Sequence, residues 1–352
     1  MAGAEKILVV RVGLGGDLVM ITPALNQLLA GFPAAEVHLL TTAEGRRVMQ
    51  GYHERLTRIW LYHRRFPARL WLQRTLTREL RAQGYTRIFI MEDKPFYRNW
   101  LGDAAPLVHT LGRGAEGQHF CTRLADLVDG ALPEPPPRGW VTLGYSAAGE
   151  SAARQLLAAH GIAPEALLVG LHPVFSGSSR WPWSDRKGQR HRVWPPAFFA
   201  RLARLLQREA AARQRPLSIV IDTLPDDRAV VESIVEQSAG AIVMLSAPPD
   251  FDRYKALLAR LDVLVSPNTG PMHFAAALGT PVVGLFSGWS ALDCGPFVPS
   301  DRALLLSAED QAEPARGLAA IRPETVSASV WRILDGPVPS RRRSFSAPGE
   351  SG

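Results

Sequence analysis

One segment of the chain, residues 266–288 (SPNTGPMHFAAALGTPVVGLFSG), constrains the fold more than any other. The apolar run at 261–265 that leads into it is typical of a buried strand, and residues 282–286 predict a second strand. Between them, small residues from Pro271 to Leu278 favour a helix. Backbone N–H groups at the start of such a helix suit a phosphate group. The spacing is equally compatible with an ordinary βαβ turn that binds nothing.

The rest of the chain continues this alternation and predicts an α/β protein with two Rossmann-like halves. Residues 6–12 (KILVVRV) are continuously apolar, as in a buried parallel strand, and a second series of elements starts near Leu167. The proline-rich segment 132–139 is typical of a linker. We expect three parts: an N-terminal domain at 1–150, a C-terminal domain at 151–335 and a disordered tail at 336–352.

The local pattern also predicts individual elements of both halves. In the first half, we expect a helix at 18–31 and strands at 37–41, 58–61 and 87–91. In the second half, we expect strands at 218–221 and 241–245 and helices at 196–212, 226–238, 252–259 and 323–334.

Composition narrows the partners and the compartment. The 352 residues include 40 Lys and Arg against 33 Asp and Glu, and this net charge of +7 favours anionic partners such as nucleotides, phosphorylated substrates, acidic membranes or nucleic acid. Two cysteines, Cys121 and Cys294, indicate a reducing compartment and no cysteine metal site. The chain shows neither a secretory signal nor an apolar run of about 18 residues. We expect a cytoplasmic protein, with peripheral contact at the inner face of the membrane left open.

A second glycine-containing loop, GLGGD at residues 13–17, follows the first strand. The dinucleotide pattern G-x-G-x-x-G would need glycine where Leu18 stands, so the loop disfavours a nicotinamide-dependent dehydrogenase. Asp17 is more informative, because a carboxylate after a strand-to-helix loop lies at the sheet edge where α/β proteins hold ligands. Asp is also a good helix N-cap, and that structural role stays open.

Two motifs together resemble the signatures of glycosyltransferase family 9, the bacterial heptosyltransferases and their relatives with the two-domain GT-B fold. The first, G-D-x-x-x-x-T-P, begins at Gly16, and the second, T-G-P-M-H-x-A-A-A-L-G-T-P, begins at Thr269. Between them, residues 171–173 (LHP) and 192–195 (RVWP) look like the family's strand-to-loop entry and its basic-x-Trp-Pro element. The resemblance covers roughly residues 6–335.

The resemblance implies two α/β domains facing across a cleft, with the acceptor on the first and the donor on the second. Family members transfer a sugar from a nucleotide-diphosphate donor with inversion at the anomeric carbon. Asp17 matches their catalytic base, which takes the proton from the acceptor hydroxyl, and Gly15 and Gly16 form the loop beside it. We expect no metal and no cofactor, so protein groups must meet the diphosphate charge. The residues expected at the donor are Thr269, Gly270, His273, Arg192, Asn268, Ser176 and Asp226.

Several features leave the donor and the acceptor open. Arg192 stands where the family commonly has Lys, Asn268 stands where many members carry Asp, and the family's glycine-rich turn reads DTLPD at 222–226. His273 could instead be a structural histidine, and the equivalence of Asp226 to a ribose ligand is open. ADP-heptose is one candidate donor.

Two basic segments bear on the acceptor. The insert at 175–193, rich in Arg, Lys and Trp, would either clamp phosphate groups or form a solvated loop. Residues 53–81 hold eight arginines with aromatic residues between them. This texture suits a phosphorylated glycolipid and the membrane leaflet, or simply two surface helices. No nucleic-acid motif accompanies it, so we expect no nucleic-acid partner.

The sequence therefore predicts an inverting, metal-independent transferase that acts on the lipopolysaccharide core or a related cell-surface glycan. Two alternatives stay open. One is a GT-B relative, a transferase or a sugar-nucleotide epimerase, that uses another nucleotide sugar. The other is a non-catalytic protein that binds a nucleotide sugar or an anionic lipid. Asp17 and the Thr269-Gly270 pair argue against the second alternative, whereas Asn268 and the altered turn leave it open.

Overall fold

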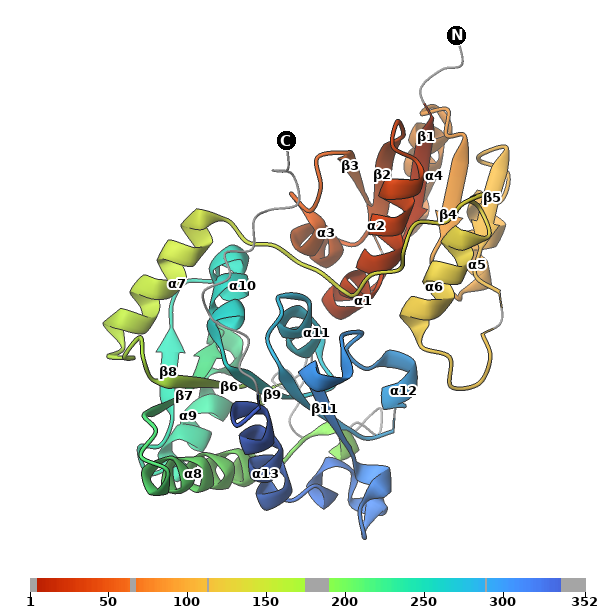
Figure 1. Cartoon of the computed structure of the whole chain (residues 1–352). Helices are drawn as coiled ribbons and strands as arrows, with labels where there is room; N and C mark the ends of the chain where they lie inside the picture. Colours follow the sequence, from red (N-terminus) through yellow and green to blue (C-terminus); the bar gives the residue numbers. More distant parts are fainter. Residues whose placement is uncertain (1–4, 64–67, 113, 175–189, 289, 337–352) are drawn as a thin grey trace. The chain divides into compact units, whose positions relative to one another are not determined.

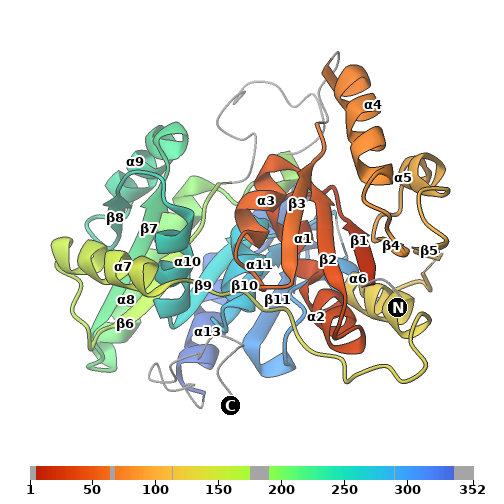
Figure 2. The same cartoon turned by 90° about the horizontal axis from the view of Figure 1, so that it is seen from above.

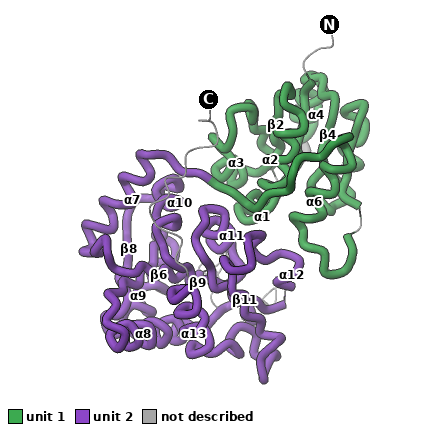
Figure 3. The backbone as a smooth tube through the Cα atoms, in the orientation of Figure 1, with its two compact units in different colours: residues 1–143 green, residues 144–352 purple. Residues whose placement is uncertain are grey.

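The computed structural model describes residues 5–63, 68–112, 114–174, 190–288 and 290–336. The chain separates into two compact units, residues 1–143 and 144–352 (Figure 3). Helix α7 (Ala147–Ala159) belongs to the second unit, where the hydroxyl of the preceding Ser146 donates to the carboxylate of Asp252. The proline-rich segment at 132–139 belongs to the first unit, where Gln27 donates a hydrogen bond of 3.1 Å to the carbonyl of Pro136.

The first unit is built on a five-stranded sheet in the order β3-β2-β1-β4-β5, in which every neighbouring pair is parallel (Figure 1). The strands are β1 (Lys6–Val10), β2 (Glu36–Thr41), β3 (Leu56–Leu61), β4 (Arg87–Ile90) and β5 (Leu107–Thr110). The helices are α1 (Gly15–Met20), α2 (Thr22–Gly31), α3 (Ala43–Met49), α4 (Ala68–Arg81), α5 (Pro95–Leu101) and α6 (Phe120–Asp129). Leu80, Tyr97 and Leu101 pack α4 and α5 on one face of the sheet, and α2 and α6 pack on the other (Figure 2).

Strand β1 lies at the centre of this sheet, and helices cover both faces of the sheet (Figure 2). Its side chains from Ile7 to Val10 are fully buried, which explains a continuous rather than alternating apolar run. The single helix expected at 18–31 is instead two helices that meet at Ile21. Pro23 lacks the N–H group that would continue the first helix, and it occupies the first turn of the second.

The second unit is built on a six-stranded parallel sheet in the order β11-β10-β9-β6-β7-β8. The strands are β6 (Leu167–Leu171), β7 (Leu217–Thr223), β8 (Val243–Ser246), β9 (Val263–Pro267), β10 (Val282–Phe286) and β11 (Ala303–Ser307). The α-helices after α7 are α8 (Pro196–Ala212), α9 (Arg228–Gln237), α10 (Phe251–Arg260), α11 (Gly270–Ala277), α12 (Ala291–Cys294) and α13 (Pro323–Leu334). The short 3-10 helices are η1 (Arg190–Arg192), η2 (Pro225–Asp227), η3 (Ser300–Arg302), η4 (Ala308–Asp310) and η5 (Pro314–Ala320). Two parallel α/β sheets, as predicted, are therefore confirmed.

A buried tryptophan organises the core of the second unit. Trp194 is completely inaccessible, its ring packs edge-on against Phe199 of α8 at 4.6 Å, and its Nε1 donates to the carbonyl of Ile321 at 2.9 Å. Because Ile321 lies two residues before the start of α13, this one side chain ties α8 to the last helix. The satisfied N–H group removes the penalty of burying a polar atom.

Within the described part of the chain, no helix is long and apolar enough to cross a bilayer.

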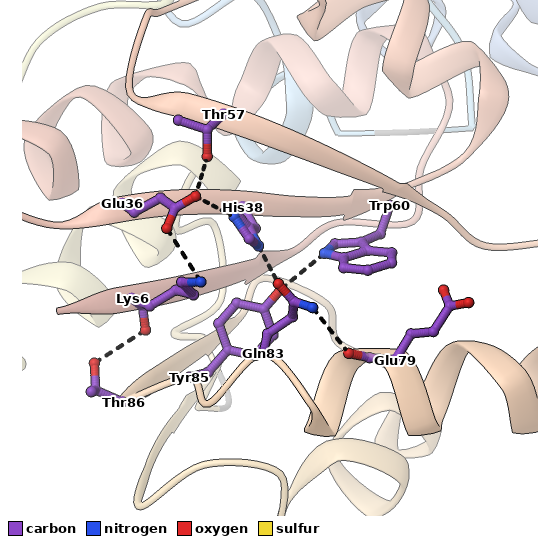
Figure 4. A network of polar contacts seen from close by, with 9 residues as sticks. All are labelled: Lys6, Glu36, His38, Thr57, Trp60, Glu79, Gln83, Tyr85 and Thr86. Carbon is purple, nitrogen blue, oxygen red and sulfur yellow. Dashed lines mark hydrogen bonds and ion pairs between the residues drawn. The ribbon is translucent and has the colours of Figure 1, made fainter. Parts of the chain in front are cut away.

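A chain of polar groups runs through the core of the first unit (Figure 4). Trp60 Nε1 donates to the Tyr85 hydroxyl at 2.8 Å, and that hydroxyl lies 2.7 Å from Nδ1 of His38. Nε2 of His38 lies 3.0 Å from Glu36, which also pairs with Lys6 at 3.3 Å. A neutral His38 protonated on Nε2 lets every donor in the chain meet an acceptor. Burial lowers the pKa of His38 below 6.5, although its hydrogen bond to Glu36 acts in the opposite direction.

We expect the free energy of unfolding to fall as the pH drops below 6.5. His38 is held neutral in the fold, so the unfolded chain binds the proton more tightly. The stability that neutral His38 contributes is fully present above pH 6.5 and is lost as the pH falls towards its lower pKa in the folded protein. Glu36, whose pKa the hydrogen bonds from His38 and Thr57 lower to about 2, does not titrate between pH 7.5 and 5.5. Urea unfolding at pH 7.5 and at pH 5.5 measures this effect. Between these two values, the free energy of unfolding should fall less for His38→Gln than for the unsubstituted protein. Equal losses would place the titrating group elsewhere.

Candidate functional site

The candidate donor loop of the second unit joins β9 to α11. The Asn268 N–H donates to the Leu285 carbonyl at 3.0 Å, which fixes the loop to β10. The hydroxyls of Ser266 and Thr269 lie 3.0 Å apart, and Thr269 has the extended backbone of an N-cap residue. Its side chain does not cap the helix. The start of α11 therefore offers its positive end to an external anion, as phosphate-binding helices do.

A cation lies beside this loop. Arg192, the last residue of η1, donates from Nη2 to the Asn268 carbonyl at 3.3 Å. Burial lowers the pKa of Arg192, but an arginine remains a cation in proteins. A small recess joins the two elements and is lined by Arg192, Pro267, Asn268, Thr269, Leu285, Ser287 and Leu318. The structure thus brings together three expected donor residues, Arg192, Asn268 and Thr269.

Two glycines fix the position of η1 and hence of Arg192. A Cβ atom at Gly317 would lie 2.5 Å from both Cα and O of His191, and one at Gly288 would lie 2.8 Å from the His191 ring. Both glycines have positive φ angles, of 59° and 69°, which other residues rarely adopt. Sequence reasoning missed these glycines, since nothing in their neighbourhood marks the approach of His191, which lies 97 residues before Gly288 and 126 before Gly317.

The remaining donor candidates lie in different surroundings. His273 is 5% exposed within α11, and Asp226 is exposed in η2. Ser176, like most of the insert at 175–193, lies outside the described residues. Asn268 also contacts a cysteine, with Nδ2 lying 3.5 Å from Sγ of Cys294. The donor roles of these side chains stay predictions.

A buried ion pair at the end of β7 escaped the sequence analysis. Asp222 lies 3.5 Å from Nη2 of Arg253 in α10, and both side chains are about nine-tenths buried. Burial raises the pKa of Asp222, while the charge of Arg253 lowers it. The sequence signal was present in the position of Asp222 at the carboxyl end of a strand, but its partner lies 31 residues further along the chain.

In the first unit, Asp17 occupies the first turn of α1. Its Oδ2 accepts a hydrogen bond of 2.7 Å from the Leu14 N–H, and its Oδ1 lies 3.0 Å from Nη2 of Arg11. Asp17 is therefore not the N-cap residue but the third helical residue, whose carboxylate reaches back to the cap position. A Cβ at Gly13 would lie 2.3 Å from Cβ of Asp17, so glycine is required there. The side chain of Asp17 is one-third exposed.

Arg11 is the partner that sequence reasoning did not name for Asp17. Arg11 is 8% exposed, stacks over the Phe120 ring at 4.5 Å and donates to the Met91 carbonyl at 3.0 Å. Glu92, also buried, lies 3.8 Å from Arg11 and accepts a hydrogen bond of 2.6 Å from the backbone of Val12. The charge of Arg11 is thus shared between two carboxylates, of which only Asp17 reaches solvent.

The glycines of this loop are also buried. Gly15 donates its N–H to Glu44 at 2.8 Å, so that group is not free for a substrate. The candidate base is therefore held from three sides: by the Leu14 N–H group, by the buried Arg11 and by Gly13, where a larger residue does not fit.

Comparisons with known proteins agree with this geometry. A family model described as glycosyltransferase family 9 (heptosyltransferase) matches residues 184–319, which include η1 and the candidate donor loop. The lipopolysaccharide core heptosyltransferase OpsX of Haemophilus influenzae is 26% identical over 101 residues, which is 28% of this chain. The aligned segment spans 29% of the length of that relative.

Solved structures resemble the chain over most of its length. A glycosyltransferase family 9 structure from Veillonella parvula matches with a TM-score of 0.78 and 17% identity, covering 95% of this chain and 99% of that one. The ADP-heptose heptosyltransferase II of E. coli matches with a TM-score of 0.69 and 19% identity, covering 94% and 99%. E. coli WaaC, solved with ADP, matches with a TM-score of 0.69 and 16% identity, covering 93% and 99%.

Two parallel-sheet units of this kind are the architecture of the GT-B fold. Within that fold, the chain is similar to glycosyltransferase family 9, whose model matches residues 184–319, and the resemblance found in its motifs is confirmed.

We expect Gly317→Ala to weaken nucleoside-diphosphate binding and to lower the free energy of unfolding by about 1–3 kcal/mol. The new methyl group must displace η1, and alanine disfavours the positive φ angle at this position. Gly144→Ala is the matched control, since a Cβ there meets nothing within 4 Å. Thermal unfolding and calorimetric titration with ADP would measure both effects. Unchanged values for Gly317→Ala would show that η1 is not clamped by this glycine.

Proposed function

We propose that the protein is an inverting glycosyltransferase that moves a sugar from a nucleoside-diphosphate donor to a hydroxyl group of a lipopolysaccharide-core or related glycan acceptor. The observation that carries the proposal is the hydrogen bond of 3.3 Å from Arg192 to the carbonyl of Asn268, two residues before α11, within the segment that matches the family model. A guanidinium group beside a helix N-terminus provides fixed positive charge for a diphosphate.

The proposed chemistry is a single displacement. The acceptor hydroxyl oxygen attacks the anomeric carbon while the bond from that carbon to the phosphate oxygen breaks, and the nucleoside diphosphate leaves with the bonding electrons. Asp17 takes the proton of the hydroxyl, and the attack from the opposite face inverts the anomeric carbon. Arg192 and the α11 amides stabilise the charge that develops on the leaving diphosphate, a role that a metal ion fills in other transferases.

The hydrogen bonds of Asp17 support its role as the base. The Leu14 N–H and Arg11 each bind one carboxylate oxygen, which fixes the orientation of the group. Glu92 also lies beside Arg11 and offsets part of its charge. Arg11 therefore orients the Asp17 carboxylate while both carboxylates share its charge. Helix capping and proton transfer use the same fixed carboxylate, and the two roles are compatible.

ADP-heptose is the donor that the relatives favour. Structures of WaaC contain ADP and ADP-2-deoxy-2-fluoro heptose. By analogy, we propose an ADP-linked heptose as the donor and a glycolipid of the lipopolysaccharide core as the acceptor. Such an acceptor is embedded in the membrane, so the proposal places the enzyme in the cytoplasm, at the inner face of that membrane.

Asp17→Asn should reduce sugar transfer by at least about 100-fold, because the amide cannot accept the acceptor proton. Donor affinity should stay within about twofold, because the base acts on the acceptor. Transfer would be followed by release of ADP, and affinity by calorimetry. Asp103→Asn is the control, an exposed carboxylate of the same unit. Full activity in Asp17→Asn would remove this residue from the mechanism.

Arg192→Ala should weaken binding of ADP by about 10- to 100-fold, the value of a charge-assisted phosphate contact, and Thr269→Ala should weaken it less. Arg208→Ala, at an exposed position in α8, is the matched control. Calorimetry with ADP, UDP and GDP would also test the nucleotide, for which ADP should bind tightest. Unchanged affinity in both variants would move the donor away from this loop.

A further inference from the structure

Four aromatic side chains form one cluster on the first unit. This aromatic cluster consists of Tyr62, which follows β3, and Phe96, Tyr97 and Trp100 of α5. The ring of Tyr62 lies 5.4 Å from that of Trp100 and 6.3 Å from that of Phe96, and Phe96 lies 5.9 Å from Trp100. Tyr62 and Tyr97 are buried, whereas Phe96 is 38% exposed. The cluster thus holds an exposed phenyl ring on a rigid aromatic base.

Helix α4 lies beside this cluster (Figure 2). Trp100 Nε1 donates to the Thr77 hydroxyl at 2.7 Å, and Arg81 forms an ion pair with Asp103, which follows α5. Arg74 and Arg78 precede Arg81 at helical spacing, so they share the side of α4 that borders α5. Both are exposed.

Exposed cations also occur on α5. Lys94 directly precedes the helix and Arg98 lies one turn further on, on either side of Phe96 in the sequence. Together with Arg74 and Arg78 of the neighbouring helix α4, these exposed cations are called the cationic rim. Among the described residues, none of these four side chains forms an ion pair. The first unit as a whole holds 18 of the 40 Lys and Arg but 13 of the 33 Asp and Glu, which is five of the seven net positive charges.

We infer that the aromatic cluster and its cationic rim dock the protein on a bilayer that contains anionic lipids. An exposed ring that enters the headgroup region, surrounded by cations that attract acidic headgroups, is the pattern of a peripheral membrane surface. The cluster follows the carboxyl ends of β3 and β4, and Asp17 follows that of β1 in the same parallel sheet. Docking here holds the edge that carries Asp17 near the lipid surface. Docking in this position fits the proposed function, in which the acceptor is embedded in the membrane. The inference rests on the proposed function only for this purpose of docking.

Vesicle co-sedimentation of the full-length protein tests the inference. Vesicles that contain phosphatidylglycerol should bind the protein, and the binding should weaken as salt rises, whereas pure phosphatidylcholine vesicles should bind far less. Arg74→Ala combined with Arg78→Ala should weaken the partitioning about 25-fold, from about fivefold for each cation. Phe96→Ala should weaken it about fivefold through lost apolar insertion.

Matched controls separate the surface from general effects. Leu107→Ala removes another exposed apolar side chain of the same unit, and Arg208→Ala removes an exposed arginine of the other. Both should bind vesicles like the unsubstituted protein, and thermal unfolding would confirm that every variant is folded.

Two results would overturn the inference. The first is equal binding to anionic and neutral vesicles, or unchanged binding in the Phe96 and double-arginine variants. The second is unchanged vesicle binding in Phe96→Ala together with a raised KM for a soluble acceptor, which would make the cluster a sugar-stacking surface. Because the vesicle assay contains no donor and no acceptor, a protein without transferase activity could still pass it, so failure of the proposed function is measured separately.

Discussion

The parallel pairing of all strands in each sheet is the constraint on which both candidate sites depend. In a parallel sheet, every strand ends at the same edge, so residues far apart in sequence meet where the chain turns into its helices. Asp17 follows β1, Glu92 follows β4, and Asn268 follows β9. Hydrogen bonds between strands hold these turns in place, and helices on both faces shield them. The chemistry of each unit is therefore concentrated along one line of loop residues.

That constraint also explains which parts of the fold could be predicted. The central strands β1 and β9 are buried on both faces, and their continuous apolar runs identified them without any knowledge of their partners. The edge strands β5 and β11 are only half-buried, and the sequence analysis predicted neither, although residues 303–306 (ALLL) of β11 are continuously apolar. The predicted helix over 323–334 matches α13, because Pro323 marks its start and its apolar spacing is regular.

Candidate site residues were predictable when a motif contained them and hidden when only folding assembled them. Asp17 and Thr269 belong to local patterns, so the sequence identified both. Glu92 lies 80 residues from the backbone N–H group that it binds. The contact of Gly317 with His191 likewise joins a glycine to a turn that is distant in sequence. Such pairs carry no local signal, because sheet order and chain crossovers decide which loops become neighbours.

The glycines around His191 have a consequence for how this protein could change its donor. A backbone turn fixed from two sides cannot shift to enlarge or reshape the recess without breaking a contact at Gly288 or Gly317. New donor preference would therefore have to come from exchange of side chains, such as Asn268 or Ser287, on an unchanged frame. Variant libraries aimed at another nucleotide sugar would best leave both glycines untouched and vary these polar positions.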